Sequence, residues 1–166
     1  PKTAWPPTLP VTAGITALGA AGVAASMELD NGYDTIITKT GATGEALENL
    51  TTVADNVFSD MPTTMDDVGV AVGEVNTRFG ATGTELENLS KDFIKFANIN
   101  GTDLNTAIDS VDSIMTKFGV DASQTKNVLG LMTKAGQDTG ISMETLETAL
   151  TTNGASLKEM GLDLTS

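Results

Sequence analysis

A ten-residue stretch that occurs twice limits the possible folds of this chain more than any other feature. Residues 41–50 read GATGEALENL and residues 80–89 read GATGTELENL, so the copies lie 39 residues apart and differ at two positions. Self-similarity at a fixed period of about 20–50 residues is typical of stacked supersecondary units, and a period near 39 fits a pair of short helices. We therefore expect each copy to open one helical hairpin of an array.

Apolar residues at helical spacing follow each decapeptide, and glycine or proline marks the expected end of each helix. The first apolar stripe spans residues 47–58 and stops before Pro62, because the residue preceding a proline is disfavoured in the helical region. The two returning helices are expected to end at Gly80 and Gly119, since glycine accepts the left-handed conformation that often follows a helix. These two ends are again 39 residues apart, which supports a repeat built of hairpins.

Threonine at the start of each repeat helix is predicted to act as an N-cap. Thr82 and Glu85 have the three-residue spacing of a capping box, in which each side chain accepts a hydrogen bond from a free backbone amide. Thr43 stands at the same place in the first copy, where Ala46 replaces the acid. The GATG stretches lack the Gly-Lys-Ser/Thr of a phosphate-binding loop. We therefore interpret them as helix starts and not as ligand loops.

A third and more divergent unit is expected in the last part of the chain. Asp121 and Gln124 can cap its first helix, and Ser142 can cap its second. The pair Asn153-Gly154 is expected to interrupt the second helix, which then ends at Gly161. The third unit thus keeps the plan of the first two with weaker signals.

These patterns together predict an all-α fold in which an apolar N-terminal helix precedes short helical-hairpin repeats of about 39 residues. The expected division is a proline-rich leading segment (1–10), an apolar Ala/Gly-rich helix (11–27), a polar connector (28–40) and the hairpin repeats (41–166), with units at 41–79, 80–118 and 119–161.

The apolar segment, residues 11–27, has 17 residues without a charge. A bilayer span takes about 20 apolar residues, so this run is at the short limit. Ala17, Ala21 and Ala25 recur every four residues and form a small-residue stripe that lets helices approach closely. Two interpretations stay open, which are a helix buried against neighbouring chains or within a lumen, and a segment that inserts into a membrane.

Composition excludes several classes of chemistry. The chain has no cysteine and no histidine, which excludes thiolate nucleophiles, Cys/His zinc sites and triads that need an imidazole. Nine basic and 22 acidic residues give a net charge of −13, which argues against binding of a nucleic-acid backbone. Asp30, Asn31 and Asp34 lack the alternating ligands of an EF-hand. We therefore expect no enzyme activity, no catalytic residue, no cofactor and no metal site.

Several short motifs follow one another in a set order along the chain. They are Thr8-Leu9-Pro10-Val11-Thr12, the Ala/Gly-rich run to Met27-Glu28, Thr40-Gly41-Ala42-Thr43, Glu48-Asn49-Leu50, Met61-Pro62, Phe79-Gly80, Phe118-Gly119 and Met160-Gly161-Leu162. Their order and spacing resemble the hydrophobic core region of tail tape-measure proteins of tailed bacteriophages, over about residues 8–164. The chain departs from this family at Asp30-Asn31-Gly32, where the family more often continues as helix.

The resemblance implies a structural component of the virion that lies in the lumen of the tail tube or at the tail tip. Such proteins set tail length during assembly in the host cytoplasm and leave the tube ahead of the DNA. They associate with themselves, with the tail tube and with tail-tip or distal tail proteins, and their apolar segment is a candidate for contact with the host membrane. The resemblance also implies that the chain is part of a longer protein.

The frequent helix breaks indicate which part of such a protein this chain forms. A ruler requires a continuous rod, which grows by about 1.5 Å per residue as a helix. Glycine, proline or Asn-Gly interrupts this chain roughly every 20 residues, so we expect a compact or refolding end region and not the rod. The alternatives are a membrane-active pore or conduit module that inserts through the apolar segment, and an unrelated helical-repeat adaptor that binds peptides.

Overall fold

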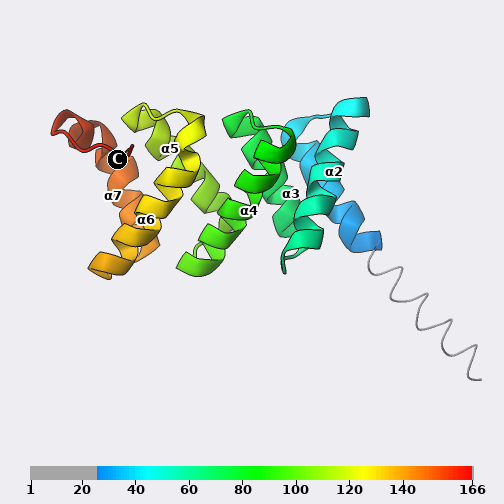
Figure 1. Ribbon diagram of the computed structural model, residues 1–166, viewed down its shortest axis with the longest axis horizontal. Coiled ribbons are helices and arrows are strands. Elements are labelled where there is room, and N and C mark those ends of the chain that lie inside the picture. The colour runs from blue at the N-terminus through cyan, green and yellow to red at the C-terminus, as the bar shows by residue number, and fades with distance from the viewer. Residues whose placement is uncertain (1–25, 166) are drawn as a thin grey trace, which may run out of the picture.

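The structure, a computed structural model, describes residues 26–165, and all of the regular structure in that range is helical (Figure 1). A leading helix occupies residues 26–40. It is followed by α2 (Gly44–Asp60), α3 (Met65–Phe79), α4 (Gly83–Asn100), α5 (Leu104–Phe118), the short 3₁₀ helix η1 (Ala122–Gln124), α6 (Thr125–Thr139) and α7 (Met143–Glu159). The predicted all-α fold is confirmed. The predicted segments 1–10 and 11–27 lie outside the described residues, except for residues 26 and 27.

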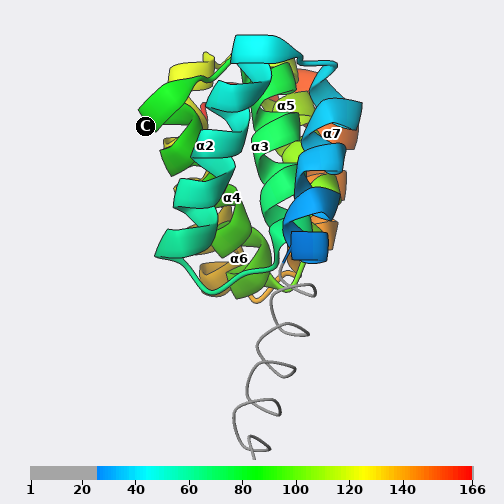
Figure 2. The same cartoon turned by 90° about the vertical axis from the view of Figure 1, so that its right-hand side faces the viewer.

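The helices form two layers that run along the long axis of the molecule. We call α2, α4 and α6 the even layer, in which α4 packs against both neighbours, and the leading helix, α3, α5 and α7 the odd layer. Each hairpin (α2–α3, α4–α5, α6–α7) contributes one helix to each layer. Figure 2, which looks along the array, shows α2 beside α3 and the leading helix on the other side of α3. The expected stacked hairpins are therefore present.

The hydrophobic core repeats with the sequence. In the even layer Ala54, Phe93 and Met132 are all buried at intervals of 39 residues. The odd layer has buried residues at the same interval, which are Val72, Val111 and Leu150. Each unit hides its apolar stripe only by packing against the next one, as is usual for helical repeat proteins.

The two glycines of each GATG stretch have a backbone role. Gly41 and Gly44 have φ angles of 66° and 58°, and Gly80 and Gly83 have φ angles of 67° and 55°. A residue with a Cβ atom would pay about 1–2 kcal/mol in this left-handed region. In each GATG stretch the first glycine therefore follows the end of one helix and the second begins the next helix, and both have the left-handed backbone conformation.

The cap hydrogen bonds predicted for Thr43 and Thr82 do not form. Thr43 and Thr82 do occupy the N-cap positions of α2 and α4, but neither side chain accepts a cap hydrogen bond, so the capping box of Thr82 and Glu85 does not form. The next residue in each case is the left-handed glycine, which turns the chain away from the usual cap geometry.

Standard caps occur where no left-handed glycine follows the cap residue. Thr64, Asp103 and Ser142 each accept a hydrogen bond from the backbone amide three residues later, at the starts of α3, α5 and α7. Asp121 caps η1 through the amide of Ser123. The predicted cap at Ser142 is thus confirmed. Asp121 caps only the short η1, and Gln124, which is the N-cap residue of α6, makes no side-chain cap hydrogen bond.

Residues 28–40, which were expected to form a polar connector, are helical. The reason is a close approach between two glycines, because a Cβ atom added at Gly69 of α3 would lie 2.6 Å from the carbonyl oxygen of Gly32. Ile36 of the same helix is fully buried in the hydrophobic core. Packing against α3 thus stabilises a helix in a stretch whose sequence is mostly polar.

Helix α7 is continuous from Met143 to Glu159, so the predicted interruption at Asn153-Gly154 is also wrong. Gly154 is buried, and a Cβ atom built on it would lie 3.1 Å from the ring of Phe118 on α5. Here too a glycine inside a helix permits a close contact with the neighbouring helix.

Candidate functional site

The described residues contain no cluster that suggests metal chemistry. Within residues 26–165 no group of three or more His, Cys, Asp or Glu side chains is placed to hold a metal ion. Asp30, Asn31 and Asp34 lie on the leading helix and not in a loop. The distinctive features of the molecule are instead a ladder of cations on the odd layer, two grooves on the even layer and one buried carboxyl group.

The cation ladder consists of Lys39, Arg78 and Lys117, which are spaced 39 residues apart near the ends of successive odd-layer helices. Lys39 Nζ lies 2.6 Å from Glu74 Oε1 on α3. The side chain of Lys117 donates to the carbonyl oxygen of Thr151 on α7. Each of these cations therefore ties its own helix to the next helix of the layer.

Arg78 makes the most extensive contacts of the ladder. Its Nε atom lies 2.6 Å from Glu74 Oε2, and its Nη1 atom lies 3.0 Å from Asp109 Oδ1 and 3.3 Å from Asp112 Oδ2 on α5. Burial acts to raise the pKa of Glu74, but hydrogen bonds from Lys39 and Arg78 outweigh it and lower that pKa. This network joins three consecutive odd-layer helices and has a structural role.

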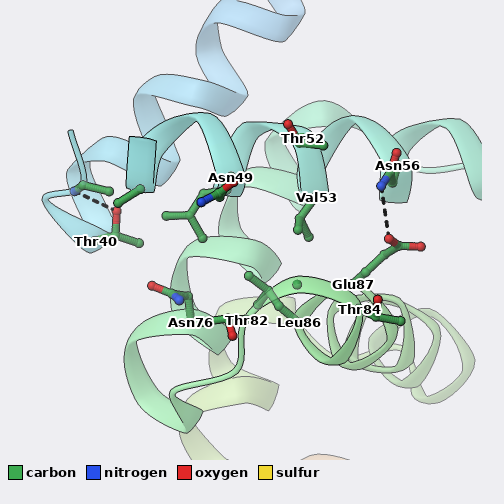
Figure 3. Close-up of a pocket in the computed structure, with 14 residues that line it drawn as sticks. Thr40, Asn49, Thr52, Val53, Asn56, Asn76, Thr82, Thr84, Leu86 and Glu87 are labelled. Atoms are coloured by element: carbon green, nitrogen blue, oxygen red, sulfur yellow. Dashed lines mark hydrogen bonds between the residues drawn. The ribbon is translucent and has the colours of Figure 1, made fainter. Parts of the chain in front are cut away.

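The first groove lies between α2 and α4, where the two copies of the decapeptide meet (Figure 3). Its volume is about 770 Å³. Leu50, Val53 and Leu86 are apolar residues of its lining, and Asn56 Nδ2 donates to Glu87 Oε2 at 3.2 Å. The remaining lining is mostly neutral and polar, from Thr40, Asn49, Thr52, Asn76, Thr82 and Thr84. The groove offers amide and hydroxyl groups and a single carboxylate, but no cation.

The second groove repeats the first between α4 and α6. One cavity of about 540 Å³ is lined by Glu85, Asn88, Leu89, Lys91, Asp92, Lys95, Ala122, Ser123 and Lys126. Each of these residues lies 39 positions after a residue of the first groove, in order Ala46, Asn49, Leu50, Thr52, Val53, Asn56, Gly83, Thr84 and Glu87. An adjoining cavity of about 490 Å³ shares Asp92, Lys95 and Lys126 and extends along the same helices. The two grooves are thus equivalent in position but differ in charge.

The buried carboxyl group is Glu147 on α7. Its side chain is 3% exposed, and its Oε1 atom has no hydrogen-bond partner. Burial raises the pKa of Glu147 to about 7, and the charge of Glu144 adds to the rise while a hydrogen bond with Ser110 opposes it. Sequence reasoning missed this residue, although counting back 39 positions would have placed it at the core position of Ile108.

The membrane interpretation of the apolar segment concerns residues that the structure does not describe. Within residues 26–165 no helix is both long and apolar enough to cross a bilayer. Of the predicted segment 11–27, only Ser26 and Met27 belong to that range.

Comparison with known proteins adds one finding to this geometry. A family model described as phage-related minor tail protein matches residues 52–166, which is most of the chain and contains all helices from α3 onward. Comparisons with curated proteins and with solved structures gave no match. The stacked hairpins and the extent of the family match lead to one conclusion. The chain belongs to the family of phage-related minor tail proteins.

Proposed function

We propose that this chain is a structural component of a phage tail and part of a tape-measure protein that lies in the lumen of the tail tube. The observation that carries the proposal is the family match over residues 52–166. The order of motifs that resembles tape-measure proteins, over about residues 8–164, also supports the proposal. A lack of nucleophilic cysteine and of imidazole agrees with a structural and not an enzymatic role.

The folded-back helices support a role for this region as a compact end of the tape-measure protein. As one straight helix, the described 140 residues would extend about 210 Å. Its helices from α2 to α7 have only 15–18 residues, or about 22–27 Å each, and successive ones return on themselves. A chain arranged in this way contributes little length to a rod, so the measuring part would lie elsewhere in the protein.

The proposed partners are other copies of the chain, the tail tube and the tail-tip or distal tail proteins. The proposed location is the virion tail, with the host cytoplasm as the site of assembly. Direct binding of the DNA that passes through the tube is not proposed, because the net charge of −13 repels phosphate groups. An acidic surface instead suits a protein that must be expelled ahead of DNA.

Particles before and after DNA ejection provide the main test. Peptides from residues 41–166 would be quantified by mass spectrometry in purified virions and in empty particles after triggered ejection. We expect these peptides in virions and their loss from the empty particles. A tail tube protein serves as the internal control. Absence of the peptides from virions, or their full retention after ejection, would contradict the proposal.

Tail length separates a compact region from a measuring rod. An in-frame deletion of residues 80–118 removes one repeat of 39 residues. If these residues formed part of a helical ruler, the tail would shorten by about 58 Å. We expect electron microscopy to show tails of unchanged length, since the repeat folds back within the array. A shortening near 58 Å would place the array in the ruler.

A further inference from the structure

The electric charge of the even layer changes sign along the array. Helix α2 carries four carboxylates and no cation, α4 carries three carboxylates and two lysines, and α6 carries one carboxylate and two lysines. The layer is therefore most negative at α2 and weakly positive at α6. In a chain with a net charge of −13, a helix with a net positive charge is a local exception.

The sign changes at equivalent positions of the repeat. One series, at intervals of 39 residues, is Glu48, Glu87 and Lys126, and another is Asn56, Lys95 and Lys134. Asn56 and Glu87 line the first groove. Lys95, Lys126 and Lys134 line the second groove and its adjoining cavity. The change thus takes place on the outer surface that carries the grooves, which we call the even face.

The cations at the α6 end are largely free to bind another molecule. The side chains of Lys126 and Lys134 are 79% and 71% exposed. Lys126 Nζ lies 3.9 Å from Asp92 Oδ2, at the limit of an ion pair, and Lys134 pairs only with Asp138 one turn away. Exposed pairs of this kind contribute little energy. Among the described residues no ion pair involves Lys95.

The acids at the α2 end are similarly available. Glu45 and Glu48 are exposed, and within the described part of the chain neither forms an ion pair. The other two acids of α2 have partners, since Asp55 accepts a hydrogen bond from Tyr33 and Asp60 pairs with Lys91. One end of the even face therefore presents unpaired carboxylates and the other presents exposed ammonium groups.

We propose that the even face binds the even face of a second copy of this chain about a two-fold axis, with α2 of each copy against α6 of the other. In a two-fold interface the same patch serves both partners and must be complementary to itself. An antiparallel arrangement turns the charge change along the layer into two identical attractive contacts, with α4 of both copies at the centre. A parallel arrangement would place like charges opposite each other.

The size and shape of the even face suit such a contact. Three helices about 25 Å long and about 10 Å apart cover an area of about 750 Å², near the roughly 800 Å² that each partner buries in a stable complex. Ile99 of α4 is 66% exposed and lines the second groove together with Phe96. The grooves between the helices can take side chains of the partner, as the centre of an interface requires.

This inference gives a surface and a geometry to the self-association in the proposed function, and it rests on that proposal. Its test uses the purified chain, residues 1–166, without any phage. Failure of the test would overturn this interface alone, because the tape-measure role is judged by the fate of the protein during DNA ejection.

A charge exchange between two variants tests the pairing. One variant carries Glu45→Lys with Glu48→Lys, and the other carries Lys126→Glu with Lys134→Glu. Either change places like charges opposite each other in a homodimer, so each variant should self-associate at least about 100-fold more weakly than the unchanged chain. Mixed in equal amounts, the two variants should form a one-to-one dimer, because both contacts are then attractive again. Analytical ultracentrifugation at low salt would measure the unchanged chain, the two variants and their mixture.

The matched control for the first variant is Asp34→Lys with Glu159→Lys, which makes the same charge change on the leading helix and on α7 of the odd layer. It should dimerise like the unchanged chain. Raising the salt from about 0.05 to about 0.5 M should weaken the dimer. The proposal is overturned if the unchanged chain is monomeric, if association does not respond to either double substitution, or if the mixed variants remain apart. An association through residues 11–27 would give the second of these results.

Discussion

Glu147 occupies a position that the preceding unit fills with Ile108, and both residues are buried. A carboxyl group there has lost its contact with water without gaining a cation, which is why its pKa is raised to about 7. Such a group weakens the native state when it is ionised, because the unfolded chain ionises it at no cost. The ionised form of Glu147 thus lowers the stability of the last hairpin at neutral pH.

Replacement of this carboxyl group should therefore stabilise the protein. Because the pKa of Glu147 is higher in the folded state than its ordinary 4.5, the native state is fully stable below pH 4.5 and loses stability as the pH rises to about 7. Glu147→Gln should raise the free energy of unfolding by about 1–3 kcal/mol at pH 8, with a gain that shrinks toward pH 4.5. Urea unfolding at several pH values would measure it. The exposed Glu159→Gln on the same helix is the control, and a pH-independent gain would contradict the explanation.

A second prediction at this scale concerns the left-handed glycines of the links. Gly80 has a φ of 67° and no atom within 4 Å of an added Cβ, so strain alone decides the effect of a side chain there. Gly80→Ala should lower the free energy of unfolding by about 1 kcal/mol.

The matched control for this substitution is Gly130→Ala. Gly130 lies inside α6, has equally open surroundings and no positive φ, so alanine should raise stability by about 0.5–1 kcal/mol. Thermal unfolding followed by circular dichroism would compare the two variants. Equal effects of both changes would show that the backbone conformation at Gly80 does not matter.

At the scale of helices, the odd layer is held by two kinds of contact between neighbours. The leading helix approaches α3 so closely at Gly32 and Gly69 that no side chain fits between them. Farther along, the cations Lys39, Arg78 and Lys117 bridge from each helix to the next. The cation bridges recur at the repeat spacing, whereas the glycine contact belongs to the first junction of the layer.

Arg78 offers a test of the bridging contacts. Arg78→Met keeps the aliphatic stem and removes the charge, which leaves Glu74, Asp109 and Asp112 with less compensation. The loss should be about 1 kcal/mol at neutral pH and smaller in high salt, since the side chain is partly exposed.

The pH dependence provides a second signature of the same network. The pKa of Glu74 is lowered in the folded state, so its contribution to stability is present above its ordinary pKa of 4.5 and disappears as the pH falls through the folded value. The destabilisation by Arg78→Met should therefore shrink in acid. Urea unfolding would measure this, with Lys95→Met as a control in a side chain that has no described ion pair. A loss that is the same in acid and at neutral pH would point to packing and not to charge.

Among the described helices α2 to α7, the main contacts lie within a hairpin and between neighbouring hairpins, so the stability should grow with the number of units. Deletion of residues 80–118 joins Phe79 to Gly119, whose φ of 66° matches the 67° of Gly80. The shortened chain should keep its helix content per residue and unfold at lower urea concentration. Circular dichroism and small-angle scattering would measure both. A collapse of the helical signal would show that the middle unit is indispensable.

Local patterns in the sequence were sufficient for the all-α class, the 39-residue period and most helix ends, because helical periodicity and left-handed glycines act over a few residues. The family match also agrees with the tail-protein part of the resemblance. None of this required knowledge of distant contacts.

Apart from the threonine caps, which fail because a left-handed glycine follows each threonine, contacts between residues more than 30 positions apart account for what sequence patterns missed. Residues 28–40 are helical because Gly32 packs on α3, and α7 continues past Gly154 because that glycine packs on Phe118. The burial of Glu147, the cation ladder and the paired grooves likewise arise only when one hairpin lies on the next. A repeat indicates in advance which positions are equivalent, but their burial and charge partners depend on the stacking of the helices.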